Sequence, residues 1–482
     1  MTDDADLRAT ELPFRFGPPP ATHAAVVRQT LLRELNEASL LKRLTVVRGL
    51  PGAGKTTLLA QWAGLLRQMS RSVAWLSLDG GDADAGVFVA DLATALAGAG
   101  HRSLAEEVRA TCVDGSSAAL ERWSRRIASA FNRLQERPIV ILDRFEVVRG
   151  TLVERLVGEV LQHARTIHVV VASRTRPALP FGRLLAQNQL FEIDPADLDF
   201  TSAETHAAFG GLLPEIYTRR LHVATGGSPI AVELARRSLE EPGRPGRVAA
   251  NWRDWLDDYY RSEVLDGLAP DVLETMSRLV VARFDLSLAQ ALIGSGAADV
   301  IERLRHTEGL LLRDRATREF HFPEMLRRFL EERLLTRLDA QERARLHSRA
   351  AGWFAERGLL KEALRHAMLA GERERALELL ERVGSTNVVI DEGIPATRAF
   401  FEWIDAASDR TRLGMTLSLA VVRAHEGRGP EAVALVGQVR EQLQAGDAAD
   451  LGPIRHQLTL AEGLVRGFVD ELPDEEHDRA LS

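Results

Sequence analysis

The sequence has almost no cysteine: Cys112 is the only one in 482 residues. A single thiol excludes an internal disulfide framework and a thiolate zinc cluster, and it favours a reducing compartment. No apolar run approaches the roughly 20 residues that cross a bilayer. The acidic N-terminal stretch MTDDADLRATELPF also lacks the apolar core of a secretory signal. We therefore predict a cytoplasmic protein with no membrane contact.

Positive charge is also in short supply. Lys and Arg number 61 against 69 Asp and Glu, and the formal net charge is -8. This balance argues against a broad nucleic-acid-binding surface. Only three lysines occur, Lys42, Lys55 and Lys361, so a lysine in this chain suggests a specific role. The remaining composition, 45% hydrophobic and 27% charged, is that of a globular chain with about three domains.

From Leu44 to about Phe200, short apolar runs alternate with amphipathic stretches. The runs are LTVV (44–47), VAWLSL (73–78), IVIL (139–142) and HVVVAS (168–173). Helical patterns lie between and beside them at 56–69, 86–99, 118–135 and 151–163. Continuous apolar strands that alternate with helices predict a parallel sheet with helices on both faces, which is an α/β fold.

The first of these strands runs into GLPGAGKT, Gly49 to Thr56, which fits the phosphate-binding pattern G-x-x-x-x-G-K-[ST]. Glycines let backbone N–H groups turn inward around phosphates, and the following helix adds positive potential at its N-terminus. We expect Lys55 to neutralise the β- and γ-phosphates and the Thr56 hydroxyl to ligate Mg²⁺. The alternative, a chance glycine-rich turn, does not explain the strand–loop–helix order. The predicted ATP- or ADP-binding residues are Gly49, Pro51, Gly52, Ala53, Gly54, Lys55, Thr56 and Thr57.

A second metal ligand is predicted at Asp143, directly after the run IVIL. Ligands bind at the carboxyl ends of parallel strands, so Asp143 is expected to hold Mg²⁺ together with Thr56. The alternative is a plain strand-end cap. The next residue is Arg144, at a position where many ATPases of this layout carry a second acid that orients water. Glu146 is the nearest substitute and our candidate catalytic residue; the alternative is a solvated glutamate at a helix start.

Two further residues are weaker candidates. Arg174 follows the strand HVVVAS and is predicted to sense the γ-phosphate as a second catalytic residue, although this chain has many surface arginines. Pro229, in Gly227-Ser228-Pro229, begins a predicted helix and is expected to pack against the nucleotide base. The alternative is an ordinary proline at the first position of a helix.

After Thr201 the apolar strands stop, apart from one short strand pair expected at about 310–322. Amphipathic helices joined by Gly-containing turns follow, and from about residue 338 they predict a TPR-like solenoid. The polar stretch EEPGRPGR (240–247) is the best linker candidate. The predicted parts are an N-terminal segment (1–30), a P-loop NTPase domain (31–205), a helical domain with the Gly-x-Pro motif (206–262), a winged-helix-like domain (263–335) and a TPR-like helical repeat domain (336–482).

Beyond the P-loop, a series of segments resembles the large ATP-dependent LuxR-type transcriptional regulators, the MalT-like members of the STAND class of signalling NTPases. Their order along nearly the whole chain carries the resemblance: VVRQTLLREL (26–35), GKTTLLAQWA (54–63), VAWLSLDGGDAD (73–84), LDRFE (142–146), VASRTRPALPFGRL (171–184), LDFTSAE (198–204), TGGSPIAVELA (225–235), EVLDGLAPDVLETM (263–276), FHFPEMLRRFLEERL (320–334) and LHSRAAGWFAERGLLKEALRHAMLAG (346–371).

The resemblance implies an ATP switch. ADP would hold a closed monomer, ATP with an inducer would open the chain and drive self-association, and hydrolysis would reset it. The helical solenoid would receive an inducer or a regulatory protein.

The chain departs from the family pattern in three places. Arg144 stands where a second acid is common, so we expect a slow ATPase at most. The family's usual His before an LLREFL-like helix aligns with Pro323, while His321 lies two residues earlier, and this weakens the case for a nucleotide contact from the winged-helix segment. The sequence ends at LPDEEHDRALS without a recognisable helix-turn-helix. We therefore expect DNA contact only through a module absent from this chain.

Two other functions stay open. An AAA+-like ATPase acting on macromolecules needs fast turnover and usually the second acid that Arg144 replaces. A solenoid scaffold with a vestigial nucleotide site would not need Lys55, Thr56 and Asp143, all of which are present. The leading hypothesis is an ATP/ADP-binding signal-transduction switch, an ATP-dependent transcriptional regulator whose solenoid senses an inducer or partner.

Overall fold

The computed structural model divides into two compact units. Unit 1 comprises Met1–Met276 with Gly296–Leu334, and unit 2 comprises Ser277–Ser295 with Leu335–Ser482. Cys112, the linker candidate at 240–247 and the C-terminal LPDEEHDRALS lie outside the described residues. The structure describes residues 15–20, 26–111, 119–239, 251–266, 268–307, 310–314, 316–333, 338–388, 401, 408–445 and 452–470.

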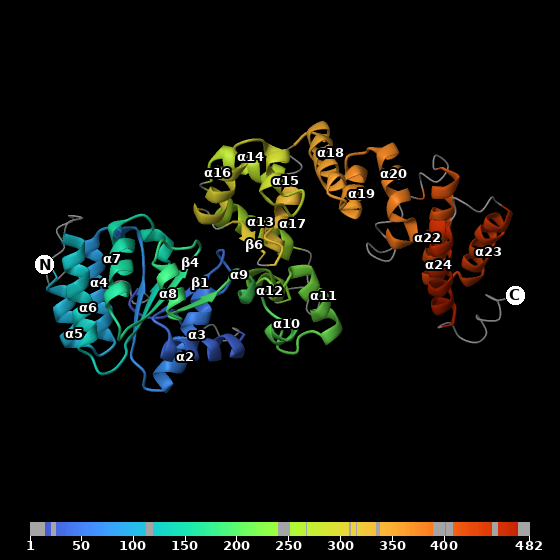
Figure 1. Cartoon of the computed structure of the whole chain (residues 1–482). Coiled ribbons are helices and arrows are strands. Elements are labelled where there is room, and N and C mark those ends of the chain that lie inside the picture. Colours follow the sequence, from blue (N-terminus) through green and yellow to red (C-terminus); the bar gives the residue numbers. More distant parts are fainter. Residues whose placement is uncertain are drawn as a thin grey trace. The chain divides into compact units, whose positions relative to one another are not determined.

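Unit 1 is built on a five-stranded parallel sheet with the order β2-β3-β4-β1-β5 (Figure 1). Four strands coincide with the predicted apolar runs. The edge strand β5 was not predicted, because it is only four residues long and its two central residues are partly exposed. The strands are β1 (Leu44–Arg48), β2 (Val73–Ser77), β3 (Ile139–Asp143), β4 (His168–Ser173) and β5 (Leu190–Ile193).

The order of the strands brings the predicted site residues to one edge of the sheet. β4 lies between β1 and β3, with Arg48 opposite Ser173 and Leu142 opposite Val171. Because all strands are parallel, the loop after β1, the end of β3 and the end of β4 meet at the carboxyl edge. This is the edge at which such sheets bind ligands.

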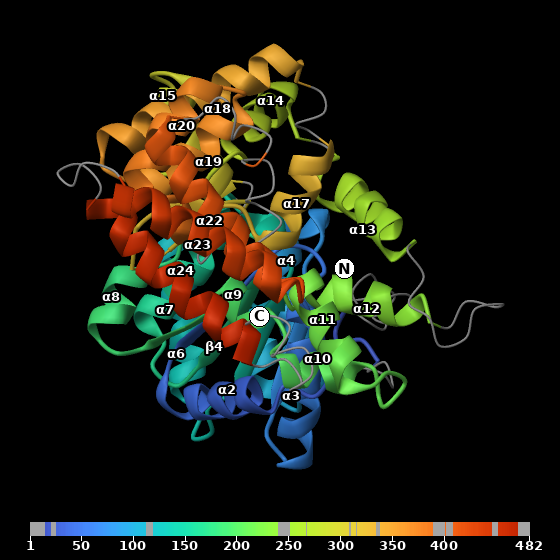
Figure 2. The same cartoon turned by 90° about the vertical axis from the view of Figure 1, so that its right-hand side faces the viewer.

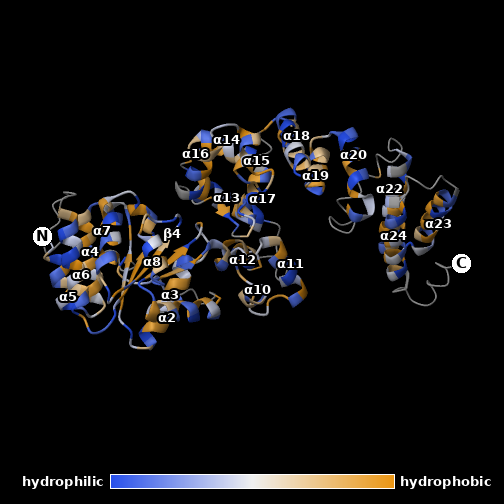
Figure 3. Cartoon of the chain, in the orientation of Figure 1, coloured by the Kyte–Doolittle hydropathy of each residue, from blue (hydrophilic) through white to orange (hydrophobic). Residues whose placement is uncertain are grey.

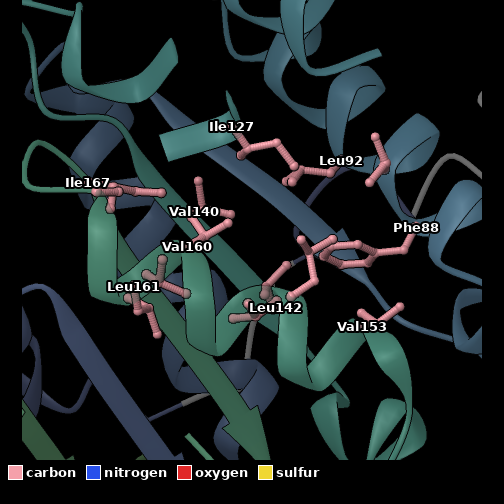
Figure 4. Packing of buried hydrophobic residues seen from close by; sticks show 14 of the residues in the cluster. Phe88, Leu92, Ile127, Val140, Leu142, Val153, Val160, Leu161 and Ile167 are labelled. Carbon is pink, nitrogen blue, oxygen red and sulfur yellow. The ribbon is translucent and has the colours of Figure 1, made fainter. Parts of the chain in front are cut away.

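Both faces of the sheet are buried, which explains the continuous apolar runs. Alternate strand residues face opposite sides. One side packs against α2 (Gln29–Leu41) and α3 (Lys55–Gln68). The other packs against α4 (Ala85–Gly98), α6 (Leu120–Asn132) and α7 (Leu152–His163), and Figure 4 shows side chains gathered there around Val140 and Leu142 of β3. Hydrophobic residues are concentrated in the strands in Figure 3. The predicted α/β fold is confirmed.

Short elements complete the α/β part, and helices follow it. The short elements are η1 (Gly80–Ala83), α5 (Arg102–Arg109), η3 (Phe145–Val148), α8 (Phe181–Ala186) and α9 (Pro195–Leu198). The helical segments that follow are α10 (Ser202–Ala208), α11 (Glu215–Thr225), α12 (Pro229–Arg237), α13 (Trp252–Tyr260), η4 (Arg261–Leu265), α14 (Pro270–Leu279), α16 (Ala297–Glu302), η5 (Arg303–Thr307) and α17 (Glu324–Arg333).

The strand pair predicted at 310–322 is confirmed as an antiparallel ladder of β6 (Leu312–Arg313) and β7 (Phe320–His321).

The described part of unit 2 is helical, as predicted. Adjacent helices α18, α19 and α20 pack side by side (Figure 2). Helices α22, α23 and α24 share an apolar core. Such stacked helical pairs are the repeat-like arrangement expected of a solenoid. No helix in the described residues of the whole chain is long and apolar enough to cross a membrane. The helices are α15 (Leu286–Ile293), α18 (Ala340–Glu356), α19 (Leu360–Leu369), α20 (Arg373–Val383), α22 (Asp409–His425), α23 (Gly429–Ala445) and α24 (Gly452–Asp470).

Candidate nucleotide site

The phosphate-binding loop connects β1 to α3 and requires its glycines. Gly52 and Gly54 have φ of +76° and +84°, in the left-handed region that other residues rarely adopt. A Cβ atom on Gly52 would lie 2.8 Å from the Cβ of Ile230 and 2.9 Å from the Tyr259 hydroxyl. Glycine therefore serves two purposes at this position, the loop conformation and the close approach of α12 and α13.

Lys55 is the first residue of α3, and its ammonium group lies inside the loop. Its Nζ donates hydrogen bonds to the carbonyl oxygens of Gly49 (2.7 Å) and Leu50 (3.0 Å). Burial lowers the pKa of Lys55 to about 8, although the nearby carboxylates of Glu146 and Asp143 oppose the shift. A buried ammonium beside backbone N–H groups at a helix N-terminus suits a phosphate anion.

The two predicted metal ligands are in direct contact. The Thr56 hydroxyl donates a hydrogen bond of 2.9 Å to Oδ2 of Asp143, which is only 3% exposed. Burial raises the pKa of Asp143, while the hydrogen bond from Thr56 partly offsets the shift. A hydroxyl and a carboxylate side by side are hard oxygen ligands of the kind that Mg²⁺ takes in nucleotide sites. The residues present therefore fit a magnesium nucleotide.

Glu146 and Arg174, predicted as catalytic residues, form an ion pair. The Nε of Arg174 lies 3.2 Å from Oε1 of Glu146, and the Arg174 backbone N–H donates to Oε2 at 3.1 Å. Arg174 also donates from Nη1 to the carbonyl oxygen of Glu263, at 3.3 Å. Neighbouring Arg144 is exposed and has a φ of +60°. The structure thus places both predicted residues at the site and engages them with each other.

These groups surround one cavity of about 720 Å³, a size common for small-molecule sites. Gly49 and Ala53 belong to the loop but do not line the cavity. The apolar side chains in its lining include Val26, Phe200 and Ala208. The predicted residues that line the cavity are Pro51, Gly52, Gly54, Lys55, Thr56, Thr57, Asp143, Glu146, Arg174 and Pro229.

Pro229 lines the cavity beside the P-loop. It is the first residue of α12, and its Cβ lies 3.8 Å from the position that a Cβ on Gly54 would take. A proline at this helix position needs no N–H partner. Contact with a nucleotide base stays a prediction.

Several lining residues were not predicted from the sequence, and Arg28 is one of them. It is 6% exposed and donates to the carbonyl oxygens of Asp197 (3.0 Å), Leu198 (2.7 Å) and Asp199 (3.1 Å). Its guanidinium also lies 5.0 Å from the centre of the Phe200 ring. These partners are about 170 residues away along the chain, so no local pattern could have revealed them.

Residues near the start of the predicted winged-helix domain contact the site, but they are not the residues that the family pattern indicates. Among the residues described, neither His321 nor Pro323 lines the cavity. The contacts come instead from Tyr259 at the P-loop and from the Glu263 carbonyl at Arg174. Further along, Arg328 donates from Nη1 to the carbonyl oxygen of Ala224 at 2.7 Å, which ties α17 to the end of α11.

Comparison with known proteins supports the predicted resemblance. Residues 261–344 match the family model described as the MalT winged helix domain. The HTH-type transcriptional regulator MalT of Cronobacter sakazakii is 27% identical over 394 residues, covering 77% of this chain and 42% of that protein. These two matches confirm the winged-helix segment and the resemblance to MalT-like STAND NTPases.

Other relatives carry different names. The serine/threonine-protein kinase PknK of Mycobacterium tuberculosis is 29% identical over 414 residues, which is 83% of this chain and 37% of the relative. A STAND protein with a tetratricopeptide repeat sensor from Pyrococcus horikoshii aligns over 97% of this chain and 72% of its own, at 14% identity and a TM-score of 0.37. The chain spans about two fifths of the length of the curated relatives it matches.

Proposed function

We propose that this chain is an ATP/ADP-binding switch of a MalT-type regulator. The observation that carries the proposal is the arrangement of Lys55, Thr56 and Asp143 around one cavity at the carboxyl edge of the sheet. Their proximity supports the proposed roles in phosphate and Mg²⁺ binding. The match of residues 261–344 to the MalT winged helix domain supports the regulatory assignment.

Different residues of the site would bind different parts of the nucleotide. Lys55 would give up its two carbonyl partners to the β- and γ-phosphates, and the loop N–H groups would hold the phosphate oxygens. Thr56 and Asp143 would hold Mg²⁺, which neutralises charge on the phosphates when bound. The apolar lining residues Val26 and Phe200 would pack against the base.

Hydrolysis is proposed to be slow. Glu146 is engaged by two donors of Arg174, so it would have to leave that ion pair before it could orient a water molecule. Arg144 carries no carboxylate that could replace it. A slow step suits a switch, because the ATP-bound state then persists.

The signalling roles rest on the resemblance. The helices of unit 2 would receive an inducer or a regulatory protein, and ATP would favour self-association.

The test is calorimetry of Mg-ATP and Mg-ADP binding to the full chain. Lys55→Ala should weaken both at least tenfold and up to about 100-fold, since a hydrogen bond to a charged group contributes about 1.5–3 kcal/mol. The matched control is Lys42→Ala, since Lys42 bonds the Asn188 carbonyl at 3.1 Å and does not line the cavity. Unchanged affinity in Lys55→Ala would contradict the assignment. Unassisted turnover near the typical ~10 per second would favour the AAA+-like alternative.

A further inference from the structure

Gln61 of α3 has an unexplained acceptor beside the nucleotide cavity. The side chain lines the cavity, and its Nε2 donates a 2.8 Å hydrogen bond to the carbonyl oxygen of Val26. Because a carbonyl only accepts, this bond fixes which end of the amide is the nitrogen. The other end, Oε1, is buried and has no hydrogen-bond partner among the described residues. A buried acceptor without a partner is unfavourable, because it has lost its hydrogen bonds to water without gaining a replacement.

The position of Gln61 on α3 places it away from the phosphate-binding N-terminus of this helix. Thr57, Leu58 and Gln61 all line the cavity, at the spacing of one helix face. Gln61 lies six residues beyond Lys55, which is about 9 Å along the helix axis. Phosphates bind at the helix N-terminus, so Gln61 lies away from them, beside the apolar lining residue Val26.

The backbone carbonyls of residues 26–28 each already accept one hydrogen bond. The carbonyl of Val26 accepts from Gln61, that of Val27 accepts from the N–H of Gln29 at 3.1 Å, and that of Arg28 accepts from the N–H of Leu32 at 2.9 Å. Backbone carbonyls of such a segment could otherwise accept from an amino group on a base. Each of these three carbonyls thus accepts one hydrogen bond, whereas the nearby side-chain Oε1 of Gln61 accepts none from the described residues.

We infer that Gln61 selects adenine: its Oε1 accepts a hydrogen bond from the exocyclic amine of the base, while its Nε2 holds residues 26–28 against α3. The inference rests on the proposed nucleotide-binding function. Hypoxanthine has a carbonyl oxygen where adenine has the amine, so it would set two acceptors against each other. Sites built to hydrogen-bond a group reject analogues that lack it, because the buried partner is then left unpaired.

The experiment is calorimetry with Mg-ADP and Mg-IDP. Their bases differ at position 6, where a carbonyl oxygen replaces the amine, and in the proton that hypoxanthine carries on the adjacent ring nitrogen. The full chain should bind ADP about tenfold more tightly than IDP, corresponding to one hydrogen bond of about 1.4 kcal/mol. Gln61→Met keeps the length of the side chain and removes its amide, so it should lose about tenfold in ADP affinity and bring the ADP-to-IDP ratio close to one. The control is Gln68→Met on the exposed end of α3, which should keep the ratio of the unmodified chain.

Gln61→Ala serves as a second variant should the longer methionine perturb folding. Equal affinity of the unmodified chain for ADP and IDP would overturn the inference, and so would a tenfold ratio that survives in Gln61→Met or Gln61→Ala. Failure of the proposed function has a different signature, since then the unmodified chain would bind neither nucleotide.

Discussion

Replacing Gly52 by alanine tests whether the P-loop and the helices above it are packed as tightly as the structure indicates. An alanine at φ +76° is strained by about 1–2 kcal/mol. Its Cβ would also lie 2.8 Å from the Cβ of Ile230 and 2.9 Å from the Tyr259 hydroxyl, and overpacking of this kind typically costs about 1–3 kcal/mol. The two effects together predict a loss of about 2–5 kcal/mol in the free energy of unfolding of unit 1.

Urea unfolding followed by tryptophan fluorescence can measure this loss, because Trp62 and Trp75 are buried beside the P-loop strand and helix in unit 1. The control is Gly64→Ala in the interior of α3, where a Cβ would meet nothing within 4 Å. That change should stabilise the unit by about 0.5–1 kcal/mol, since alanine is the better helix former. A Gly52→Ala chain with the stability of the unmodified protein would refute the packing described for this loop.

Two further predictions concern pH. Burial lowers the pKa of Lys55 to about 8, so the ammonium loses its proton as pH rises above about 8. The affinity for Mg-ADP should then fall, approaching tenfold per pH unit. Calorimetry should show a flatter profile for Lys55→Arg, and a flat profile for the unmodified chain would contradict the burial of this charge. In unit 2, His347 and His366 lie with their Nδ1 atoms 3.0 Å apart, and burial lowers their pKa values to about 4 and about 3. As pH falls below about 6.5, these histidines therefore take up protons in the unfolded chain before they do so in the folded chain. The free energy of unfolding of unit 2 should fall by up to about 2 kcal/mol per histidine by about pH 5. Thermal unfolding should show this loss in the unmodified chain and a weaker pH dependence in His347→Gln, and equal dependence in both would refute it.

The site residues that were predicted from the sequence are those that lie in short, continuous sequence patterns. The P-loop is a continuous pattern between a strand and a helix, so its fold and its residues follow from eight neighbouring positions. Asp143 was found because it ends an apolar strand, and the strand order places it beside Thr56.

The missed features depend on residues far apart in the chain. Arg28 binds carbonyls of residues 197–199, and Tyr259 reaches Gly52 from α13. β5 is a half-exposed edge strand without a continuous apolar run. Gln61 did leave a local signal, since it is a polar amide within GKTTLLAQWA, but its meaning depends on the carbonyl of Val26.

The contacts of Arg174 suggest how the nucleotide state could reach the rest of unit 1. Its side chain pairs with Glu146 in the α/β part and bonds the carbonyl of Glu263 in η4. In the proposed switch, a γ-phosphate at the P-loop would compete for the same guanidinium, whereas ADP would not. Glu263 lies four residues beyond Tyr259, which packs against Gly52. A guanidinium drawn toward the phosphate would therefore weaken a contact that joins this helical segment to the α/β part. A ligand shifts a conformational equilibrium only if it binds the two conformations with different affinities. Competition for the Arg174 guanidinium would give ATP such a difference in affinity, and ADP would lack it.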